Sequence, residues 1–381
     1  MSGRVLALLG DSFYASGGIA QFNRDLIAAW VEMDSVTEIV LVPRFATGSR
    51  SGLPGKVVEK PPVRSLILYV LSAALESIRR PSFDFIFCGH LNMIPLAVIL
   101  SRMTGTPVWL QLHGIEAWEK PSRTMRWSVE RTALVTCVSR HTRRMFLRWA
   151  CLPTHRVLVL PNTVGEQFNQ NGKRDLQIAN HELAENTVIL TVSRLSTKEG
   201  YKGHDRVIGC MPELCAEFDN LVYAIAGAGD LQGSLQKLAD SLGVGHAIKF
   251  LGPIGPNELP SVYRGADVFV MPSTGEGFGI VFLESIACGT PVIAGDSDGA
   301  RDPLHDGALG MLCDDASLAT SIRQALRSAR TPMSNENSNG ARAESVMRHF
   351  GRTAFSATVL AMTDRVLDME FERVGADKSS C

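Results

Sequence analysis

The apolar residues of this chain are concentrated in short unbroken runs, which are separated by stretches with helical spacing. In the first half the runs occupy residues 4–10, 38–43, 83–89, 107–114, 133–139 and 156–162. Unbroken runs are typical of strands covered on both faces of a parallel sheet, because a half-exposed strand alternates apolar with polar residues. The first half therefore predicts a repeating strand–helix unit, with helices at segments such as 20–33 and 140–150.

This rhythm is interrupted once and then resumes. Residues 165–186 are polar and predict no strand, so we expect a linker there. Strand-like runs return at 187–195, 221–229, 248–252, 267–273 and 291–295, and a polar interval at 330–342 precedes a last helical pattern near 341–373. We expect an α/β protein of two Rossmann-like, doubly wound domains that face each other across a cleft. The predicted domains are 1–165 and 166–350, and a helix in 351–381 is expected to cross back to the first domain.

Charge and cysteine usage add to this picture. The net charge is −1, but residues 1–165 carry 19 basic and 11 acidic residues, a net of +8, and the remainder a net of −9. The first domain should favour an anionic partner, unless its basic residues are only scattered solvated surface. The eight cysteines form no C-x-x-C pair, which argues for a reducing compartment and against a zinc site or a disulfide framework. The apolar runs are too short for a signal peptide or a membrane span, so we expect a cytoplasmic protein that is soluble or peripheral.

Ligands of doubly wound domains bind at the carboxyl ends of the strands, so functional residues are expected in the turns that follow the strands. The first turn contains Gly17 and Gly18 before a helix, where backbone amides could hold an anion or a sugar hydroxyl. His113 ends another predicted strand, and Glu116 follows it. A plain tight turn and a structural histidine are the alternatives.

Basic residues follow the first strand of the second half. Arg194 leaves this strand, and Lys198 and Lys202 precede the next helix. A guanidinium and an ammonium at the carboxyl end of a strand suit a diphosphate, although a solvated basic loop would have the same composition.

Two glycine-rich turns carry weaker signals. Gly227, Gly229 and Gly233 form G-x-G-x-x-x-G, one residue longer than the dinucleotide fingerprint, and no acidic residue ends the next strand. Because the segment does not meet these two criteria of the fingerprint, a nicotinamide site is disfavoured. A site for another nucleotide and a plain tight turn are the two interpretations that remain. Asp296-x-Asp298 has the spacing of a metal-bridging acid pair, which is common by chance in such turns.

The segment 275–289, GEGFGIVFLESIACG, places Glu276 and Glu284 eight residues apart. Glu276 precedes a predicted amphipathic helix, and Glu284 is expected within that helix but off its apolar face. The glycines and helix amides between them suit a diphosphate, while two carboxylates can accept hydrogen bonds from hydroxyls of a sugar and a ribose. A charge at the helix N-terminus and a solvated helix acid would explain the same residues without a ligand.

Together these motifs resemble the retaining glycosyltransferases of family 4, which have the GT-B fold. The likeness covers most of the chain, and its most specific element is the E-x7-E signature from Glu276 to Glu284. Supporting elements are the turn at 17–18, HGIE at 113–116, LPNTV at 160–164, VSRL at 192–195 with YKGHD at 201–205, and DGARDPLHDGALG at 298–310.

The resemblance implies a role for each site residue. The implied catalytic residues are His113, Glu276, Arg194 and Lys202, with His113 facing the transferred sugar and Arg194 and Lys202 gripping the diphosphate. Lys202 is preferred to Lys198 because it stands directly before the helix. The implied donor-binding residues are Gly17, Gly18, Gly227, Pro253, Ile254, Glu276, Gly277, Phe278, Gly279, Ile280 and Glu284, with Glu284 on the ribose. Glu116 and Asn162 are placed on the acceptor side.

The implied reaction moves a hexose from a UDP- or GDP-sugar to a saccharide acceptor, lipid-linked, with retention, in polysaccharide or glycolipid biosynthesis. Because the two cations stabilise the leaving diphosphate, neither a metal nor another cofactor is expected. The basic first half, with Trp118, Trp127, Phe146 and Trp149 among its arginines, predicts binding to the anionic inner face of the cytoplasmic membrane and not to nucleic acid. A nucleotide-sugar epimerase of the same fold is the first alternative, and an NAD-dependent dehydrogenase the second.

Overall fold

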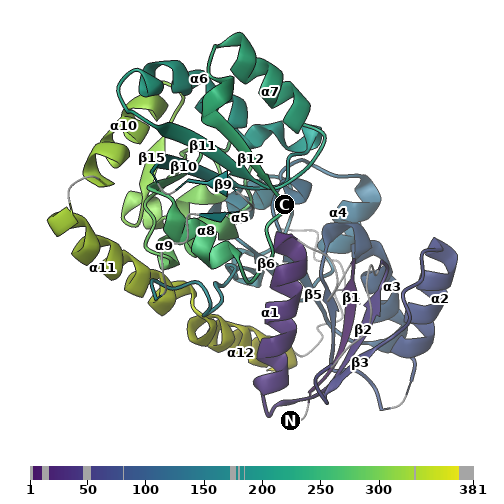
Figure 1. The fold of residues 1–381 in the computed structure, drawn as a ribbon. Coiled ribbons are helices and arrows are strands. Elements are labelled where there is room, and N and C mark those ends of the chain that lie inside the picture. Colours follow the sequence, from purple (N-terminus) through teal and green to yellow (C-terminus); the bar gives the residue numbers. More distant parts are fainter. Residues whose placement is uncertain are drawn as a thin grey trace. The chain divides into compact units, whose positions relative to one another are not determined.

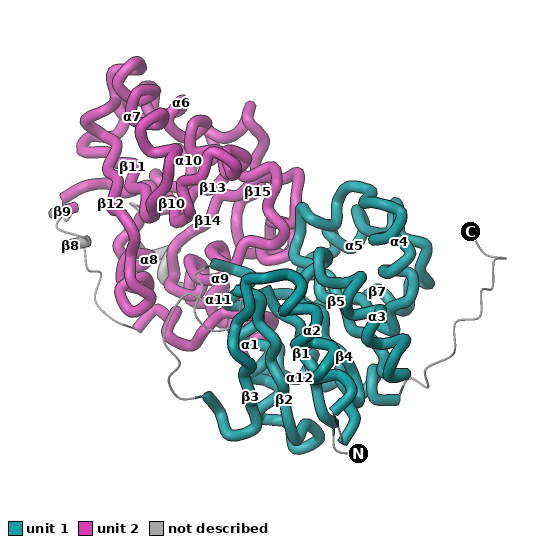
Figure 2. Tube along the Cα trace, turned by 90° about the vertical axis from the view of Figure 1, so that its right-hand side faces the viewer, with its two compact units in different colours: residues 1–162, 353–381 teal, residues 163–352 magenta. Residues whose placement is uncertain are grey.

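The computed structural model describes residues 3–10, 17–45, 53–79, 81–171, 177–178, 181–183, 185–329 and 332–368. The chain divides into two compact units, which Figure 2 colours separately. Unit 1 comprises Met1–Asn162 and Thr353–Cys381, and unit 2 comprises Thr163–Arg352. The C-terminal segment therefore belongs to the same unit as the N-terminus.

Unit 1 contains a seven-stranded sheet in the order β3-β2-β1-β4-β5-β6-β7, in which all paired strands are parallel (Figure 1). The strands are β1 (Gly3–Leu9), β2 (Val36–Pro43), β3 (Val57–Glu59), β4 (Phe85–Cys88), β5 (Val108–Leu112), β6 (Leu134–Cys137) and β7 (Val157–Val159). Every residue of β4, β5 and β6 is buried, as the unbroken apolar runs predict. The strand order reverses between β1 and β4, which is the switch point of a doubly wound sheet.

Helices cover both faces of this sheet. Helices α2 (Leu66–Ser77), α3 (Ile94–Thr104), α4 (Arg123–Val129) and α5 (Arg140–Leu147) enclose one core on the first face. Helices α1 (Gly18–Glu32) and α12 (Arg352–Asp368) enclose the other core, which contains Phe22, Trp30, Phe355 and Val359. The indole N–H of Trp30 donates to Thr363 Oγ1 at 3.1 Å, so α12 is joined to α1 by a buried hydrogen bond as well as by packing.

Unit 2 repeats this plan with a six-stranded parallel sheet in the order β12-β11-β10-β13-β14-β15. The strands are β10 (Thr187–Val192), β11 (Leu221–Ala226), β12 (Ile248–Gly252), β13 (Val268–Met271), β14 (Val292–Gly295) and β15 (Met311–Cys313). The helices are α6 (His204–Cys215), α7 (Gln232–Ser241), α8 (Leu259–Gly265), α9 (Ile280–Ala287), α10 (Leu318–Ala329) and α11 (Pro332–Phe350). Both sheets therefore have the Rossmann-like order, and in unit 2 the switch point lies between β10 and β13.

Three local predictions were wrong. The segment 165–186 contains a short antiparallel pair, β8 (Gln177–Ile178) and β9 (His181–Glu182), because strands of two residues leave no apolar run to recognise. The polar interval at 330–342 is helical from Pro332 onward, since α11 packs against α9 and tertiary contacts outweigh weak propensity. The final helical pattern consists of two helices, α11 and α12, which are separated at Gly351.

Six cysteines in the described part of the chain have free thiols: Cys88, Cys137, Cys210, Cys215, Cys288 and Cys313. No helix in the described part of the chain has both the length and the hydropathy needed to cross a bilayer.

Candidate active site

The candidate residues of unit 2 lie on two loops that start from neighbouring strands. Arg194 and Lys202 follow β10, and Glu276 follows β13. These strands pair in parallel through Ile189 and Val268, so their carboxyl ends lie at the same edge of the sheet. Since this is the switch point of unit 2, the loops occupy the position where doubly wound sheets bind ligands.

Lys202 is the residue that joins the two loops. Its ammonium nitrogen lies 3.6 Å from Glu199 Oε2 and 3.7 Å from Glu276 Oε2. The Lys202 side chain is only 13% exposed, so solvent screens these two attractions less than it would at the surface. The backbone N–H of Thr274 also donates to the Tyr201 carbonyl at 3.0 Å, which fastens the loops to each other a second time.

Glu199 was not among the residues expected from the sequence. Its Oε1 pairs with the guanidinium of Arg194, and its Oε2 faces Lys202, so one carboxylate holds both candidate cations. Oε2 of Glu199 and Oε2 of Glu276 are buried and have no hydrogen-bond partner within the described residues. The spacing from Glu199 to Lys202 is one helical turn, which is the signal that could have identified this pair.

The two candidate lysines differ in their surroundings. Lys198 is exposed, and its backbone N–H donates to Ser196 Oγ. Lys202 is largely buried and ends a 3-10 helix, Thr197–Lys202, directly before α6. This arrangement favours Lys202 as the residue that contacts a bound anion, and the assignment stays a prediction.

Asp298 fixes the loop that carries Glu276. Its buried carboxylate accepts hydrogen bonds from Ser273 Oγ at 2.8 Å, from the Glu276 backbone N–H at 2.7 Å and from the Ala300 N–H at 2.9 Å. Burial raises the pKa of this carboxyl to about 6, against the effect of the three donors. Gly299 allows the loops to approach, because a Cβ there would lie 2.1 Å from the Gly277 carbonyl oxygen.

The other member of the Asp-x-Asp pattern has a different environment. Asp296 pairs with Arg301 at the surface, so the two carboxylates have separate protein partners and do not form one site. The described residues contain no group of three or more His, Cys, Asp or Glu side chains that could hold a metal ion.

The position of Glu284 differs from the expectation that it lies off the apolar face of its helix. All residues from Phe282 to Ala287 in α9 are buried, and Glu284 Oε2 accepts a hydrogen bond from Tyr263 Oη at 2.7 Å. The expectation was wrong because α9 is covered by α8 and α11 as well as by the sheet. The ribose role of Glu284 stays a prediction.

The residues between the two glutamates form the start of α9. Phe278 is buried and packs against Phe350, with ring centroids 5.8 Å apart. Gly279 has a φ of +88°, and a Cβ there would lie 2.4 Å from the Phe282 ring, so only glycine fits. The segment from Gly277 to Ile280 therefore follows Glu276 directly into the N-terminus of the helix.

The glycine turn after β11 serves backbone packing. A Cβ on Gly227 would lie 1.8 Å from the Ser193 carbonyl oxygen, and one on Gly229 would lie 2.1 Å from that of Leu195. The Gly227 N–H donates to the Gly252 carbonyl at 2.7 Å, which places exposed Pro253 and half-buried Ile254 beside this turn. The turn lies against the loop that carries Arg194. Either a bound nucleotide or close packing of the two loops would require glycine at these positions.

The buried side chain of His204 forms hydrogen bonds next to the loop that carries Lys202. His204 Nε2 lies 2.8 Å from Ser193 Oγ, and Nδ1 lies 3.0 Å from Tyr223 Oη. Burial, followed by the charge of Lys202, lowers the pKa of His204 to about 4. The ring is therefore neutral at pH 7 and links β10, β11 and α6 through hydrogen bonds alone.

His113, a candidate residue of unit 1, lies at the carboxyl end of β5 and contacts the loop that follows β4. His113 follows β5, and its Nε2–H donates to the carbonyl of Gly89, which follows β4, at 3.0 Å. The Glu116 carboxylate accepts the His113 backbone N–H, and the Phe22 ring of α1 packs edge-on against the imidazole at 5.2 Å. Burial lowers the pKa of His113 to about 4, although Glu116 opposes the shift, so the imidazole is neutral at pH 7.

The remaining predicted residues of unit 1 differ in their surroundings. Gly17 caps α1 with a φ of +115°, and a Cβ at Gly17 or Gly18 would meet no atom of the described residues within 4 Å. Positive φ therefore explains Gly17, whereas neither conformation nor crowding requires Gly18. Asn162 is 9% exposed, and its Oδ1 has no hydrogen-bond partner among the described residues.

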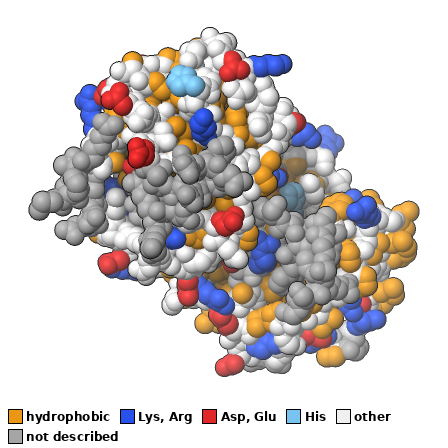
Figure 3. Space-filling model, viewed as in Figure 1, with side chains coloured by type: hydrophobic (Ala, Val, Ile, Leu, Met, Phe, Trp, Pro, Cys, Tyr) orange, Lys and Arg blue, Asp and Glu red, His pale blue; other side chains and the backbone are white. Residues whose placement is uncertain are grey.

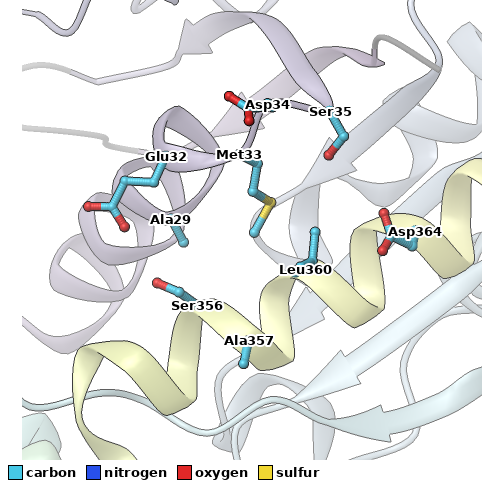
Figure 4. A pocket seen from close by; sticks show the side chains of 9 residues that line it. All are labelled: Ala29, Glu32, Met33, Asp34, Ser35, Ser356, Ala357, Leu360 and Asp364. Atoms are coloured by element: carbon cyan, nitrogen blue, oxygen red, sulfur yellow. The ribbon is translucent and has the colours of Figure 1, made fainter.

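A cavity of about 550 Å³ lies elsewhere in unit 1, between α1 and α12 (Figure 4). It is lined by Ala29, Glu32, Met33, Asp34, Ser35, Ser356, Ala357, Leu360 and Asp364. Because Met33 and Ser35 directly precede β2, this cavity lies at the amino ends of the strands. It is therefore at the opposite edge of the sheet from His113 and Gly17.

Comparisons with known proteins match both halves of the chain. Residues 16–167 match the family described as Glycosyltransferase Family 4, and residues 173–343 match Glycosyl transferases group 1. The chain is 32% identical over 335 residues to the GDP-mannose-dependent alpha-(1-6)-phosphatidylinositol monomannoside mannosyltransferase of Mycobacterium tuberculosis, covering 83% of this chain and 86% of that protein.

Two further relatives differ in how much they cover. The mannosyltransferase of the same name from Mycolicibacterium smegmatis is 34% identical over 236 residues, which are 58% of this chain and 61% of that protein, less than two thirds of its length. The crystal structure of Anabaena Alr3699/HepE in complex with UDP-glucose has a TM-score of 0.74 at 21% identity, over 95% of this chain and 99% of that one. This structural likeness shows a shared fold.

Replacing Asp298 by alanine should destabilise unit 2 by at least about 2 kcal/mol, because three buried donors would each lose their acceptor. Urea unfolding followed by circular dichroism would measure the change. Asp296→Ala is the matched control, since it removes an exposed ion pair and should change stability by less than about 1 kcal/mol. Equal effects of the two substitutions would contradict the role given to Asp298.

His204 should make stability depend on pH. Its pKa is about 4 in the folded protein and 6.5 when unperturbed, so between these values the unfolded chain binds more protons. Stability should therefore fall as the pH is lowered from 6.5 to 4, and His204→Gln should weaken that dependence. Melting temperatures across this range would test it, with exposed His246→Gln as the control that leaves the slope unchanged.

Proposed function

Because this chain belongs to glycosyltransferase family 4 and has the GT-B fold, we propose that it transfers mannose from GDP-mannose to a lipid-linked saccharide. The transfer retains the anomeric configuration and requires no metal. One observation carries the proposal: Lys202 and Arg194 lie around one carboxylate at the switch point of unit 2, beside Glu276. This arrangement suits a leaving diphosphate next to a sugar.

The cations would stabilise the charge that develops as the diphosphate leaves. The ammonium of Lys202 and the guanidinium of Arg194 each have one carboxylate oxygen of Glu199 as their partner, which a bound diphosphate could replace. Glu276 supplies a buried acceptor oxygen for a sugar hydroxyl, and Glu284 would accept a hydroxyl of the ribose. Stabilisation of the leaving group by fixed charges is the main catalytic effect in this mechanism.

Two features support transfer with retention and without a metal. The acids of the Asp-x-Asp pattern are engaged by protein donors, Asp298 by backbone and hydroxyl groups and Asp296 by Arg301. His113 donates its Nε2–H to Gly89, so this ring nitrogen offers no lone pair for nucleophilic attack, and the fixed ring would face the sugar. We therefore propose attack by the acceptor on the same face that the diphosphate leaves.

The choice of donor and acceptor rests on the relatives. The Mycobacterium tuberculosis protein is named for GDP-mannose and for phosphatidylinositol monomannoside, and it aligns with 83% of this chain. A lipid-linked acceptor also suits the net charge of +8 in residues 1–165, which would hold unit 1 at the anionic inner face of the cytoplasmic membrane.

The aromatic and basic residues of the first half of the chain are not equally well placed for this membrane contact. Phe146 and Trp149 are buried, while Trp127 is exposed and lies under the guanidinium groups of Arg102 and Arg131, at 4.8 and 4.1 Å. Arg143 donates to the carbonyls of Val157 and Thr154, so it also has a structural role. Of the aromatic residues named with the arginines, Trp127 is therefore the best placed to meet a lipid surface.

Lys202→Ala should lower turnover on the order of 10²-fold or more, because it removes a positive charge that stabilises the leaving diphosphate. Lys198→Ala is the matched control and should leave turnover within about twofold. Initial rates with GDP-mannose in excess chelator would measure both. A silent Lys202→Ala with a damaging Lys198→Ala would reverse the assignment, and complete loss of wild-type activity in chelator would argue for a metal.

Binding of the donor should raise the melting temperature, since a ligand that binds only the folded state stabilises it. We expect a larger rise with GDP-mannose than with UDP-glucose, and a loss of the rise in Glu284→Gln. Incubation with donor alone then separates the alternatives, because an epimerase would convert the sugar without an acceptor. A rise with UDP-glucose alone would contradict the choice of base and hexose.

A further inference from the structure

Helix α2 of unit 1 presents an apolar surface to solvent. The described chain has sixteen exposed large hydrophobic side chains, and seven of them fall between residues 66 and 78. These are Leu66, Ile67, Leu68, Val70, Leu71, Leu75 and Ile78, and they are 36–73% exposed. At 100° per residue they span a continuous arc of the helix, whereas the buried side consists of Tyr69, Ala73, Glu76 and Ser77. A helix of a monomeric soluble protein normally has the opposite distribution.

The neighbouring helices extend this surface. Helix α3 packs beside α2 and adds exposed Ile99 and Met103, and α4 packs beside α3 and adds Trp127. Figure 3, viewed as in Figure 1, shows hydrophobic side chains gathered over the edge of unit 1 where α2 and α3 lie. We call these nine side chains on α2, α3 and α4, together with Ile78 at the end of α2, the α2 face.

The segments that carry the α2 face are rich in basic residues. The segments 60–79, 91–104 and 123–131 contain seven basic and two acidic residues, a net charge of +5. Both acids are paired: Glu76 with Lys60 at 3.0 Å and Arg79 at 3.1 Å, and Glu130 with Arg126 at 3.9 Å. No acidic side chain in these segments is therefore left to repel an anionic partner.

We propose that the α2 face binds an anionic lipid bilayer by inserting the exposed side of α2 into the interfacial region. The inference deepens the proposed function and rests on it for the lipid-linked acceptor. It differs from purely electrostatic binding because apolar insertion, and not the arginines alone, supplies the attachment. The arginine side chains can lay their apolar stems along the surface and keep their charges among the lipid phosphates.

Three observations favour a bilayer over a protein partner or a second copy of the chain. Helix α2 has 12 residues, about 18 Å, which is too short to span a bilayer but suits a helix lying in its plane. The positive charge of the surrounding segments would repel a second copy of the same face. Trp127 between Arg102 and Arg131 also has the amphipathic surroundings typical of side chains at a membrane interface.

Sedimentation with vesicles tests the proposal on the full-length protein. The wild type should pellet with vesicles of phosphatidylcholine and phosphatidylglycerol at low salt, and less with phosphatidylcholine alone. Ile67→Gln/Leu71→Gln/Leu75→Gln should lower partitioning at least about tenfold, since it removes the middle of the exposed arc and keeps good helix formers. The matched control is Leu242→Gln/Leu360→Gln, which changes exposed apolar residues elsewhere and should bind like the wild type.

A second measurement locates the contact. Trp127 fluorescence should shift to the blue on addition of anionic vesicles, and Trp127→Phe should remove most of the shift while sedimentation persists. Arg64→Gln/Arg123→Gln should weaken binding at low salt and have little effect at high salt, where the charges are screened. Unchanged circular dichroism of the α2 variant would show that its loss of binding does not come from unfolding.

The outcomes separate this inference from the proposed function. Absence of wild-type binding to anionic vesicles at low salt would overturn the inference, even if GDP-mannose still raises the melting temperature. Vesicle binding that survives in the α2 variant would also overturn it and favour the arginines alone. A concentration-dependent dimer that the α2 variant abolishes would assign the face to a second copy instead. Loss of GDP-mannose binding with intact vesicle binding would contradict only the proposed function.

Discussion

The arrangement of the candidate site depends on one ammonium group held between two carboxylates. Lys202 comes from the loop after β10, Glu276 from the loop after β13, and Glu199 binds Lys202 and Arg194 at once. Without Lys202, the two glutamates would confront each other as buried like charges, which is unfavourable. Without Glu199, largely buried Lys202 and exposed Arg194 would lose the carboxylate that they share. The loops can therefore keep their geometry before any substrate binds, because the protein supplies the negative charge that a diphosphate would later provide.

Backbone packing gives these loops their precision. Gly227, Gly229 and Gly299 each lie where a Cβ would overlap a carbonyl oxygen of another loop, so the loops touch through main-chain atoms. Asp298 then satisfies the amide groups that such close approach would leave unpaired. Side chains such as Lys202 and Glu276 project from a framework with little freedom to adjust. A rigid framework of this kind holds catalytic groups in position at no cost when the substrate arrives.

The sequence predicts the sheets of this protein better than the details of its site. Unbroken apolar runs identified the central strands, and the turns after them contained Arg194, Lys202 and Glu276 together. The burial of Glu284 could not be predicted, because it depends on Tyr263, which lies 21 residues away on another helix. Helix α2 shows the same limit: its sequence is largely apolar, yet the packing of the unit leaves most of its large side chains facing solvent. The sequence pattern shows which residues are apolar, but the tertiary fold determines which residues each of them packs against.

The return of α12 to unit 1 has a consequence for how the protein is made. Phe355, Val359 and Val366 complete the core around Phe22 and Trp30, yet the whole of unit 2 is synthesised between these two groups of residues. A ribosome that has released only residues 1–162 therefore presents an N-terminal unit with one sheet face half covered. That unit cannot finish folding during its own translation, whereas unit 2 can close as soon as its last strand and helices emerge. Of the two units, the one whose synthesis begins first is the last to be completed, and until α12 emerges from the ribosome its aromatic core is only partly covered.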